Sequence, residues 1–362
     1  MATNKSLRQS LTRNPLLLPV AALIIMLCVN VIITPSFFKI SIQNGVLYGY
    51  TIDILNRACE LVILSIGMTL AVASSRGTDI SVGAVEAVAA AVCVRLLGSS
   101  YDAYAVPFAF AAVMCLIAGV ACGAFNGFLV ARLRIQPMIA TLILFTAGRG
   151  IAQLLSAREI NGVMVPGQIL YVRMESFKYI GGFIPGVVIP TPVFIAAAFV
   201  IATTLLLRKT ALGMYIETVG INPKAGRLVG INSTLVIFFC YVFCGLASGL
   251  AGLISSSRIY SSDANNIGLY MELDAILAVA LGGNSLGGGK FNLAGSVIGA
   301  ITIQALTTGL YAVGVSADQL PVYKAIVVVL IVTLQSEEFK RIRAVYKLKR
   351  RHARSATMEA SQ

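Results

Sequence analysis

Residues 208–232 read RKTALGMYIETVGINPKAGRLVGIN, the longest polar interval between strongly apolar runs on the side of the chain richer in Lys and Arg. Four basic residues, Arg208, Lys209, Lys224 and Arg227, keep this interval out of a bilayer, where charged side chains are costly. Six apolar runs precede it and four follow. We interpret it as a short helix and turn outside the membrane, and as the main surface that a soluble partner could contact.

The composition is that of a membrane protein. Of 362 residues, 57% are hydrophobic and 12% charged, against a charged fraction of about 25% in soluble proteins. Runs of about 20 apolar residues, enough to cross a bilayer as a helix, recur along the chain. A transmembrane β-barrel would show short alternating segments instead. The sequence therefore predicts an all-α polytopic membrane protein.

We predict about ten transmembrane helices. They cover residues 16–34, 54–74, 80–98, 105–131, 137–155, 191–207, 233–256, 271–283, 292–312 and 321–335. The first is interpreted as an uncleaved span, because no small-x-small cleavage pattern follows it. The predicted organisation is an N-terminal tail (1–15), a transmembrane domain (16–335) that includes the 208–232 loop, and a basic C-terminal tail (336–362).

The distribution of charge predicts the orientation. The formal net charge is +13, and the basic residues concentrate in the two tails, the 208–232 loop and a few short loops, as on the cytoplasmic face of a membrane protein. Ten spans then place both termini in the cytoplasm. A nucleic-acid role is disfavoured because the basic residues mark a membrane face.

No pattern for metal binding, nucleotide binding or catalysis stands out. The seven Cys lie mostly in apolar runs without a CxxC, and the only His is His352, so we expect no metal site and no disulfide scaffold. The segment GGNSLGGGKF (282–291) lacks the P-loop pattern, since Asn284 and Phe291 replace the required Gly and hydroxyl residue. No nucleophile–base pair or carboxylate dyad appears, which disfavours an intramembrane enzyme. Energy must come from a partner or an ion gradient.

Glycines recur at a spacing of four in three of the predicted spans. They are Gly119, Gly123 and Gly127, then Gly245 and Gly249, then Gly295 and Gly299. Such stripes let helix backbones approach closely where lipid removes the hydrophobic drive for association, so we assign them to packing.

Asp79 stands in GTDISVG, at a glycine-flanked break between two spans. Its carboxylate either caps a helix N-terminus through Ser81 and nearby N–H groups or lies on a substrate path, as ionisable residues inside spans often do. Asn126, near the inner end of its span, is a further candidate for the path. The residues leave both interpretations open.

One span carries a polar face. Thr146, Arg149 and Gln153 follow at i, i+3 and i+7, and a polar face on a membrane helix should look toward protein or water. They are candidate path residues. Arg149 either bonds hydroxyl groups of a transported solute or forms a structural pair with a carboxylate, and we favour the pair.

The predicted outer loop SSDANNIG contains Asp263, Asn265 and Asn266, which are candidates for docking an external partner. A plain capping role is the alternative. Glu272 and Asp274 begin the next span, where acidic residues suit a helix N-terminus.

Five segments occur in order within residues 50–335: GMTLAVASSRGTDISVGAV, NGFLVARLRIQPMIATL, GRGIAQ, TALGMYIETVGINPKAGRLVGIN and ELDAILAVALGGNSLGGGKFN. They resemble bacterial monosaccharide permeases of the ribose type, the membrane subunits of ATP-binding-cassette (ABC) importers. ILNRA (54–58) and DANNIGLYMELDAI (263–276) are most similar to the galactofuranose-type subgroup.

The resemblance implies a transport subunit without catalytic residues or a cofactor of its own, which moves a pentose or hexose across the bacterial inner membrane by alternating access. It implies three partners: a cytoplasmic ATPase that binds ATP and Mg, a periplasmic sugar-binding protein, and a second permease copy or close relative. It also implies that the 208–232 loop is a coupling helix that contacts the ATPase. The residues that the resemblance assigns to this coupling role are Gly213, Glu217, Gly220, Asn222 and Gly230.

The chain departs from the family pattern at two places. Ser75 and Arg76 make the break before GTDIS longer and more basic, with Thr78 in place of an apolar residue, and Gly226 stands where Ala is usual. Two alternatives remain: an ABC permease for another small solute, such as a nucleoside or a branched-chain amino acid, and an ion-coupled secondary transporter.

Overall fold

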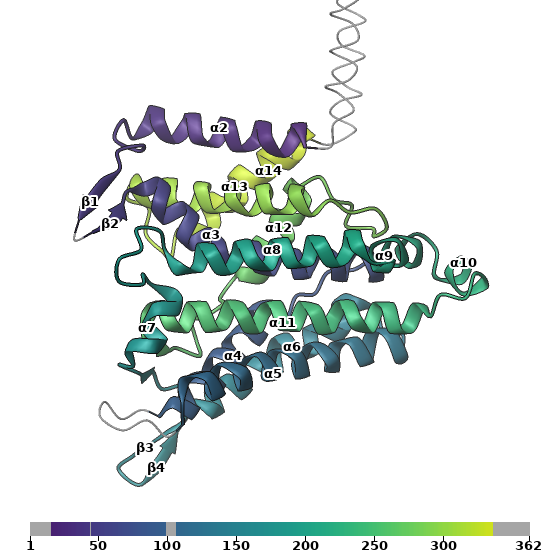
Figure 1. The fold of residues 1–362 in the computed structure, drawn as a ribbon, viewed down its shortest axis with the longest axis horizontal. Helices are drawn as coiled ribbons and strands as arrows, with labels where there is room; N and C mark the ends of the chain where they lie inside the picture. Colours follow the sequence, from purple (N-terminus) through teal and green to yellow (C-terminus); the bar gives the residue numbers. More distant parts are fainter. Residues whose placement is uncertain (1–15, 44, 99–105, 336–362) are drawn as a thin grey trace, which may run out of the picture. The chain divides into compact units, whose positions relative to one another are not determined.

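The computed structural model describes residues 16–43, 45–98 and 106–335, and helices dominate it (Figure 1). The helices are α2 (Leu17–Ile33), α3 (Tyr50–Ser75), α4 (Val82–Leu97), α5 (Phe108–Gly127), the π-helical turn η1 (Phe128–Arg132), α6 (Pro137–Leu155), α7 (Glu175–Gly181), α8 (Thr191–Lys209), α9 (Leu212–Ile221), α10 (Pro223–Leu228), α11 (Ser233–Ile259), α12 (Met271–Leu281), α13 (Leu293–Ala312) and α14 (Leu320–Gln335). The strands are β1 (Ser41–Gln43), β2 (Val46–Tyr48), β3 (Arg158–Ile160), β4 (Val163–Val165), β5 (Leu170–Tyr171) and β6 (Ser261–Ser262). The predicted tails, 1–15 and 336–362, lie outside the described residues.

The chain divides into two compact units, residues 1–308 and 309–362. In the second unit, the last turn of α13 is followed by Gly314 at a φ of 87°, and the Val315 N–H donates back to the Leu310 carbonyl at 3.1 Å. A glycine in the left-handed region is a common way to end a helix. Helix α14 then begins after a turn in which the Ser316 carbonyl accepts from the Leu320 N–H at 3.1 Å.

Each predicted span overlaps one helix, and six helices among the described residues are long and apolar enough to cross a membrane. They are α3, α5 with η1, α6, α8, α11 and α13. The prediction of a helical polytopic membrane protein is confirmed at this level, whereas the count of ten crossings stays a prediction.

Two predicted spans, 80–98 and 271–283, contain short helices that each follow a non-helical segment. Helix α4 has 16 residues and α12 has 11, about 24 Å and 17 Å at 1.5 Å per residue, against a hydrocarbon core of about 30 Å. Their N-terminal ends meet, because a Cβ on Gly83 would lie 2.1 Å from the Gly268 carbonyl oxygen. The non-helical segments before them, 76–81 and 263–270, are partly buried: Asp79 and Ile267 lie inside, whereas Asn265, Leu269 and Tyr270 are exposed. Such backbone is tolerated at membrane depth only where protein surrounds it.

Helix α3 forms the centre of the first unit. Every residue of α3 from Ala58 to Ser74 is buried, and the helix packs against α8, α9, α11 and α12. Helices α5, α6 and α8 instead expose large apolar side chains, among them Ile117, Leu142 and Ile201. A helix that is apolar on all sides belongs in the interior, whereas apolar outer faces suit contact with lipid.

The glycine stripes bring α5 and α11 into backbone contact. A Cβ on Gly119 would lie 2.4 Å from the Gly245 carbonyl oxygen, and one on Gly123 would lie 2.4 Å from the Tyr241 carbonyl oxygen. Gly299 of α13 meets α12 in the same way, because its Cβ would lie 2.1 Å from the Ala278 carbonyl oxygen. The glycines therefore pack helices together, as their spacing predicts.

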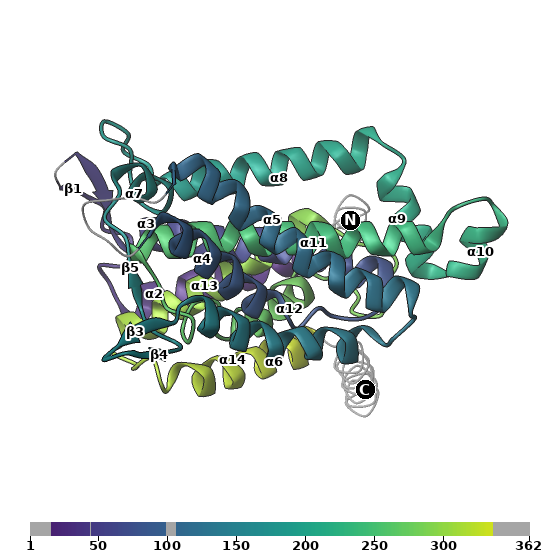
Figure 2. The ribbon, with the colours of Figure 1, turned by 90° about the horizontal axis from the view of Figure 1, so that it is seen from below.

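The loops of the first unit gather at its two ends (Figure 1). One end carries β1–β4 and α7, and β5 pairs antiparallel with β6, which follows α11. Figure 2 shows α9 and α10 at the opposite end. The segment 208–232 thus lies on the side away from the loops that were predicted to be external, and it is helical as predicted.

Candidate functional site

A polar cavity of about 330 Å³ lies between α3, α4, α11 and the loop that leads to α12. Arg258 lies in the last turn of α11, immediately before β6, so the cavity is near the end of the unit that carries the small sheets. Its lining residues are Arg57, Glu60, Glu86, Ser255, Arg258, Ile259, Asp263, Asn266, Ile267, Gly268, Leu269 and Met271. Larger hollows of about 680 Å³ and 510 Å³ lie at the same end, among loop residues, but they do not contain the buried charges.

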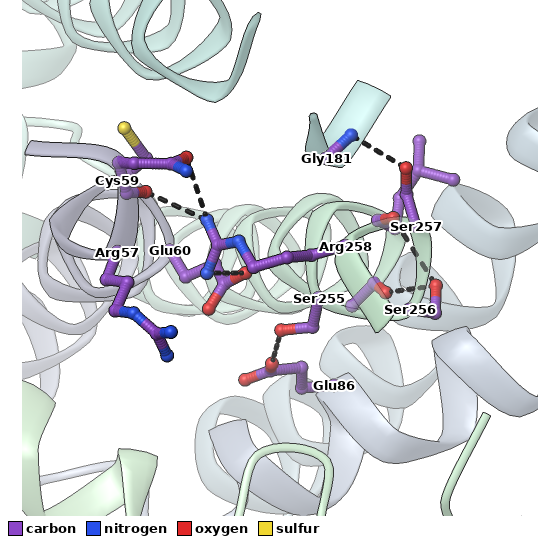
Figure 3. Close-up of polar contacts among 12 residues, drawn as sticks. Arg57, Cys59, Glu60, Glu86, Gly181, Ser255, Ser256, Ser257 and Arg258 are labelled. Atoms are coloured by element: carbon purple, nitrogen blue, oxygen red, sulfur yellow. Dashed lines mark hydrogen bonds and ion pairs between the residues drawn. The ribbon is translucent and has the colours of Figure 1, made fainter. Parts of the chain in front are cut away.

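The central contact is an ion pair between Arg258 and Glu60, whose Nη1 and Oε1 atoms are 3.0 Å apart (Figure 3). The Arg258 Nη2 also donates to the carbonyl oxygen of Asn56 at 2.8 Å and to its side-chain oxygen at 3.2 Å. The two charged side chains are only 18% and 11% exposed. Pairing and hydrogen bonding are what make buried charges tolerable. A basic residue in the last turn also suits the helix dipole of α11.

Two further buried carboxylates lie on the two short helices. The Ser255 hydroxyl donates to Glu86 Oε1 at 2.6 Å (Figure 3). Within the described part of the chain, the Glu86 Oε2 and Glu272 Oε2 atoms are buried without a hydrogen-bond partner. Buried polar atoms are normally satisfied, so each is an acceptor that water or a ligand hydroxyl would satisfy.

Arg149 and Gln153 tie α6 to the loop before α12. The Arg149 Nη1 donates to the carbonyl oxygens of Ala264 at 3.1 Å and Ile267 at 2.5 Å. The Gln153 amide donates to the Asn265 side chain at 2.9 Å. Thr146 instead bonds the Leu142 carbonyl of its own helix and is exposed. Of the three residues predicted to form a polar face, Arg149 and Gln153 therefore contact the loop before α12 and Thr146 does not. The hydrogen-bond acceptors of the Arg149 guanidinium within 3.5 Å are backbone carbonyl oxygens.

The predicted docking residues form a local turn. Asp263 Oδ1 accepts from the Asn265 N–H at 3.0 Å, and the Asn266 side chain donates to Asp263 Oδ2 at 2.6 Å. This arrangement is an Asx turn. Asp263 and Asn266 also line the cavity, so the turn shapes its wall.

Asp79, Ser81 and Asn126 form a buried chain of hydrogen bonds outside the cavity. Asp79 Oδ1 accepts from the Ser81 N–H at 3.0 Å and from its hydroxyl at 2.6 Å, and the Asn126 amide donates to the Ser81 hydroxyl at 2.8 Å. All three residues are buried. These two carboxylate contacts join Asp79 to Ser81, the residue just before α4, as in a structural turn, and the Asp79 N–H donates to the Met68 sulfur at 3.4 Å.

The coupling candidates lie on α9 and in the turns before and after α10. Gly220 packs most tightly, because its Cβ would lie 1.8 Å from the Ala73 carbonyl oxygen of α3. Asn222 caps α10 by accepting from the N–H groups of Lys224 and Ala225. The remaining candidates are Gly213, next to the Leu207 carbonyl, Glu217, half-buried on α9, and Gly230, at a φ of 84°.

The sequence reasoning missed Glu60, Glu86 and Arg258. A signal was present for the two acids, because each stands within an apolar run, where an ionisable residue is a functional candidate by default. Arg258 gave no such signal, because it lies at the end of a predicted span, where basic residues are common.

The chain combines outer helices with exposed apolar faces, a cavity lined by charged side chains near one end and a short helix pair at the other. This architecture suits a membrane permease. Residues 50–334 match the family described as permease component of the branched-chain amino acid transport system, and the chain belongs to this family. The predicted family membership is thus confirmed.

The curated relatives of the chain include several sugar permeases. The galactofuranose transporter permease protein YtfT of Escherichia coli K12 is 43% identical over 319 residues, which cover 88% of this chain and 89% of the relative. The fructose import permease protein FruF of Bifidobacterium longum is 36% identical, with 91% and 90% covered. The ribose import permease protein RbsC of Escherichia coli K12 is 35% identical, with 88% and 92% covered. No solved structure matches the chain.

Proposed function

We propose that this chain is the permease subunit of an ABC importer and carries a monosaccharide through the membrane by alternating access. It is a transport subunit, and ATP hydrolysis belongs to a separate ATPase. The observation that carries the proposal is the cavity with paired charges inside a helical permease whose relatives are permeases for galactofuranose, fructose and ribose.

The chemistry of the cavity suits a sugar. A volume of about 330 Å³ lies within the usual range of small-molecule sites, about 300–1,000 Å³. Glu60 and Glu86 accept hydrogen bonds, Arg258 and the Asn266 amide donate them, and each sugar hydroxyl does both. Galactofuranose is our first candidate for the sugar, because the galactofuranose permease is 43% identical to this chain, against 36% for the fructose permease and 35% for the ribose permease.

Passage requires a movement at the ends of the short helices. Gly268 lines the cavity, and its carbonyl is in contact with Gly83 of α4. We propose that a sugar leaving the cavity toward α9 passes between α4 and the 263–270 loop, where this contact would have to open. Arg149, which holds this loop to α6, sits beside that passage.

The partners follow from the two ends of the first unit. We assign the ATPase to α9 and α10, where Met214, Leu228 and Val229 are 64%, 89% and 72% exposed beside Lys224 and Arg227. Exposed apolar side chains rimmed by charge are typical of a protein contact. The sugar-binding protein belongs at the opposite end, near the 263–266 turn, and a second permease copy or close relative completes the assembly. With ten crossings, both termini and the α9–α10 pair lie in the cytoplasm of a bacterium, and the chain is in its inner membrane.

The test is reconstitution of this chain in vesicles with its ATPase and candidate binding protein, followed by ATP hydrolysis with galactofuranose, ribose or fructose. We expect one sugar to stimulate hydrolysis and to accumulate in the vesicles. Stimulation by a nucleoside or by leucine instead would assign another solute. Accumulation by the chain alone, driven by an ion gradient, would make it a secondary transporter.

A further inference from the structure

Arg76 ends α3 in an unusual conformation. Its φ and ψ are 61° and 30°, in the left-handed region, and its N–H donates to the Val72 carbonyl at 3.0 Å. Glycine is the usual residue at such a helix end, and a non-glycine residue with positive φ calls for an explanation. The side chain of Arg76 supplies one.

The Arg76 guanidinium binds the end of α9. Its Nε donates to the Gly220 carbonyl oxygen at 2.5 Å, and its Nη2 donates to the Ile221 carbonyl oxygen. These are the last two residues of α9, whose carbonyls have no partner within the helix and form the negative end of its dipole. The planar fork of arginine can hold two adjacent acceptors at once, which the single ammonium of lysine does less well.

The glycine-rich loop between α12 and α13 also packs against the end of α3 and the Arg76 side chain. The Gly289 N–H donates to the Ala73 carbonyl of α3 at 2.9 Å. A Cβ on Gly288 would lie 2.7 Å from Arg76 Cγ, so the arginine stem lies directly against this loop. The ends of α3 and α9 are therefore held in one junction.

The segment after Arg76 leads from this junction to the cavity. Gly77 lies against Pro137 at the start of α6, since its Cβ would lie 2.6 Å from the proline Cβ. The Asp79–Ser81 hydrogen bonds then lead into α4. Four residues after its first position, α4 carries Glu86 of the cavity. A short, buried segment thus joins Arg76 to a residue of the candidate sugar site.

We propose that Arg76 is a positioning residue that fastens α9 to the break before α4, so that a displacement of α9 by the ATPase moves α4 and its Glu86. The inference rests on the proposed function, because it assigns to Arg76 the transmission step of that transporter. Rigid-body transfer of this kind needs a stiff link between two elements, and the fork of Arg76 on the α9 carbonyls is such a link.

The test compares Arg76→Gly, Arg76→Lys and the matched control Arg134→Gly. Arg134 also has a positive φ, 58°, and lies between η1 and α6, so its replacement removes the same charge and relieves the same backbone conformation. Two quantities are measured in the reconstituted complex: amide hydrogen exchange of residues 218–222, and sugar-stimulated ATP hydrolysis relative to hydrolysis without sugar.

In Arg76→Gly we expect exchange of the last turn of α9 to rise by about tenfold or more, the factor for one lost hydrogen bond to a charged group. Stimulation by sugar should fall with it. Arg76→Lys should be intermediate, and Arg134→Gly should match the wild type in both measurements. The result supports the proposal only if exchange and stimulation change together.

Unchanged exchange in Arg76→Gly would overturn the proposal, as would faster exchange with full stimulation. If Arg134→Gly lost as much sugar stimulation as Arg76→Gly, the loss would be due to removal of a positive charge on the cytoplasmic side, and this too would overturn the proposal. If no sugar stimulates even the wild-type complex, the proposed function fails, whereas the exchange measurement still reports whether Arg76 holds α9.

Discussion

Replacing Arg258 by Met is expected to destabilise the chain strongly. The change removes the 3.0 Å ion pair with Glu60 and two hydrogen bonds to Asn56, and it leaves a carboxylate that is only 11% exposed without its counter-charge. Removing one partner of a buried pair costs about 3–5 kcal/mol. The chain has no Trp and most of its Cys are buried, so thermal unfolding in detergent can be followed by a thiol-reactive fluorophore.

The double variant Glu60→Met/Arg258→Met separates the cost of an orphaned charge from the contribution of the pair. Replacement of a buried pair by apolar residues of similar volume is often neutral or stabilising, so the double variant should recover most of the lost stability. The control is Arg57→Met, which breaks an i,i+4 pair with Asp53 whose side chains are 54% and 44% exposed and should cost less than about 1 kcal/mol.

Two outcomes would refute this reasoning: an Arg258→Met chain that unfolds like the wild type, or a double variant no more stable than Arg258→Met. Transport adds a second readout. If the cavity is the sugar site, the double variant should be stable and yet fail to import sugar, because its hydrogen-bonding groups are gone. Full sugar import by the double variant would show that Glu60 and Arg258 do not bind the sugar.

Gly245→Ala should destabilise the protein by about 1–3 kcal/mol or more, because the new Cβ would lie 2.3 Å from the Gly119 carbonyl oxygen across the α5–α11 contact. The control is Gly150→Ala, where nothing lies within 4 Å of the new Cβ. Equal shifts of the unfolding temperature in the two variants would contradict the packing argument. Glu217→Arg, at a half-buried position of α9, should abolish sugar-stimulated ATP hydrolysis while membrane insertion stays intact, and normal stimulation would contradict the coupling role. Arg149→Leu should lower thermal stability by about 1.5–3 kcal/mol, the range for a hydrogen bond to a charged group, whereas unchanged stability with lost import would place Arg149 on the sugar path.

Much of the helical framework could be predicted because its signals are local. Apolar runs and their charged or proline-bearing ends set α6 at 137–155 and the start of α11 at 233, as the structure has them. The glycine spacing also predicted close packing, although not which helix pairs with which. Helices α4 and α12 lie within the predicted spans 80–98 and 271–283, but the meeting of their N-terminal ends was not predictable, because it depends on how segments distant in the sequence pack together.

The candidate site was less predictable because it is assembled from distant segments. Gln153 and Arg149 share a helix face in the sequence, but their partners lie more than 100 residues away. Glu60 and Glu86 could have been singled out by their charge alone, whereas the Glu60–Arg258 pair depends on how α3 meets α11. The role of Arg76 was out of reach for the same reason: the sequence shows an extra basic residue, and only the fold shows the α9 carbonyls beside it.

The glycine contact between α5 and α11 also limits how this protein can move. Where a carbonyl oxygen sits 2.4 Å from the place of a missing Cβ, neither helix can slide along the other without driving a side chain into the opposing backbone. We therefore expect α5 and α11 to move together as one unit. Any movement that opens a path for the sugar then has to occur in helices outside this pair.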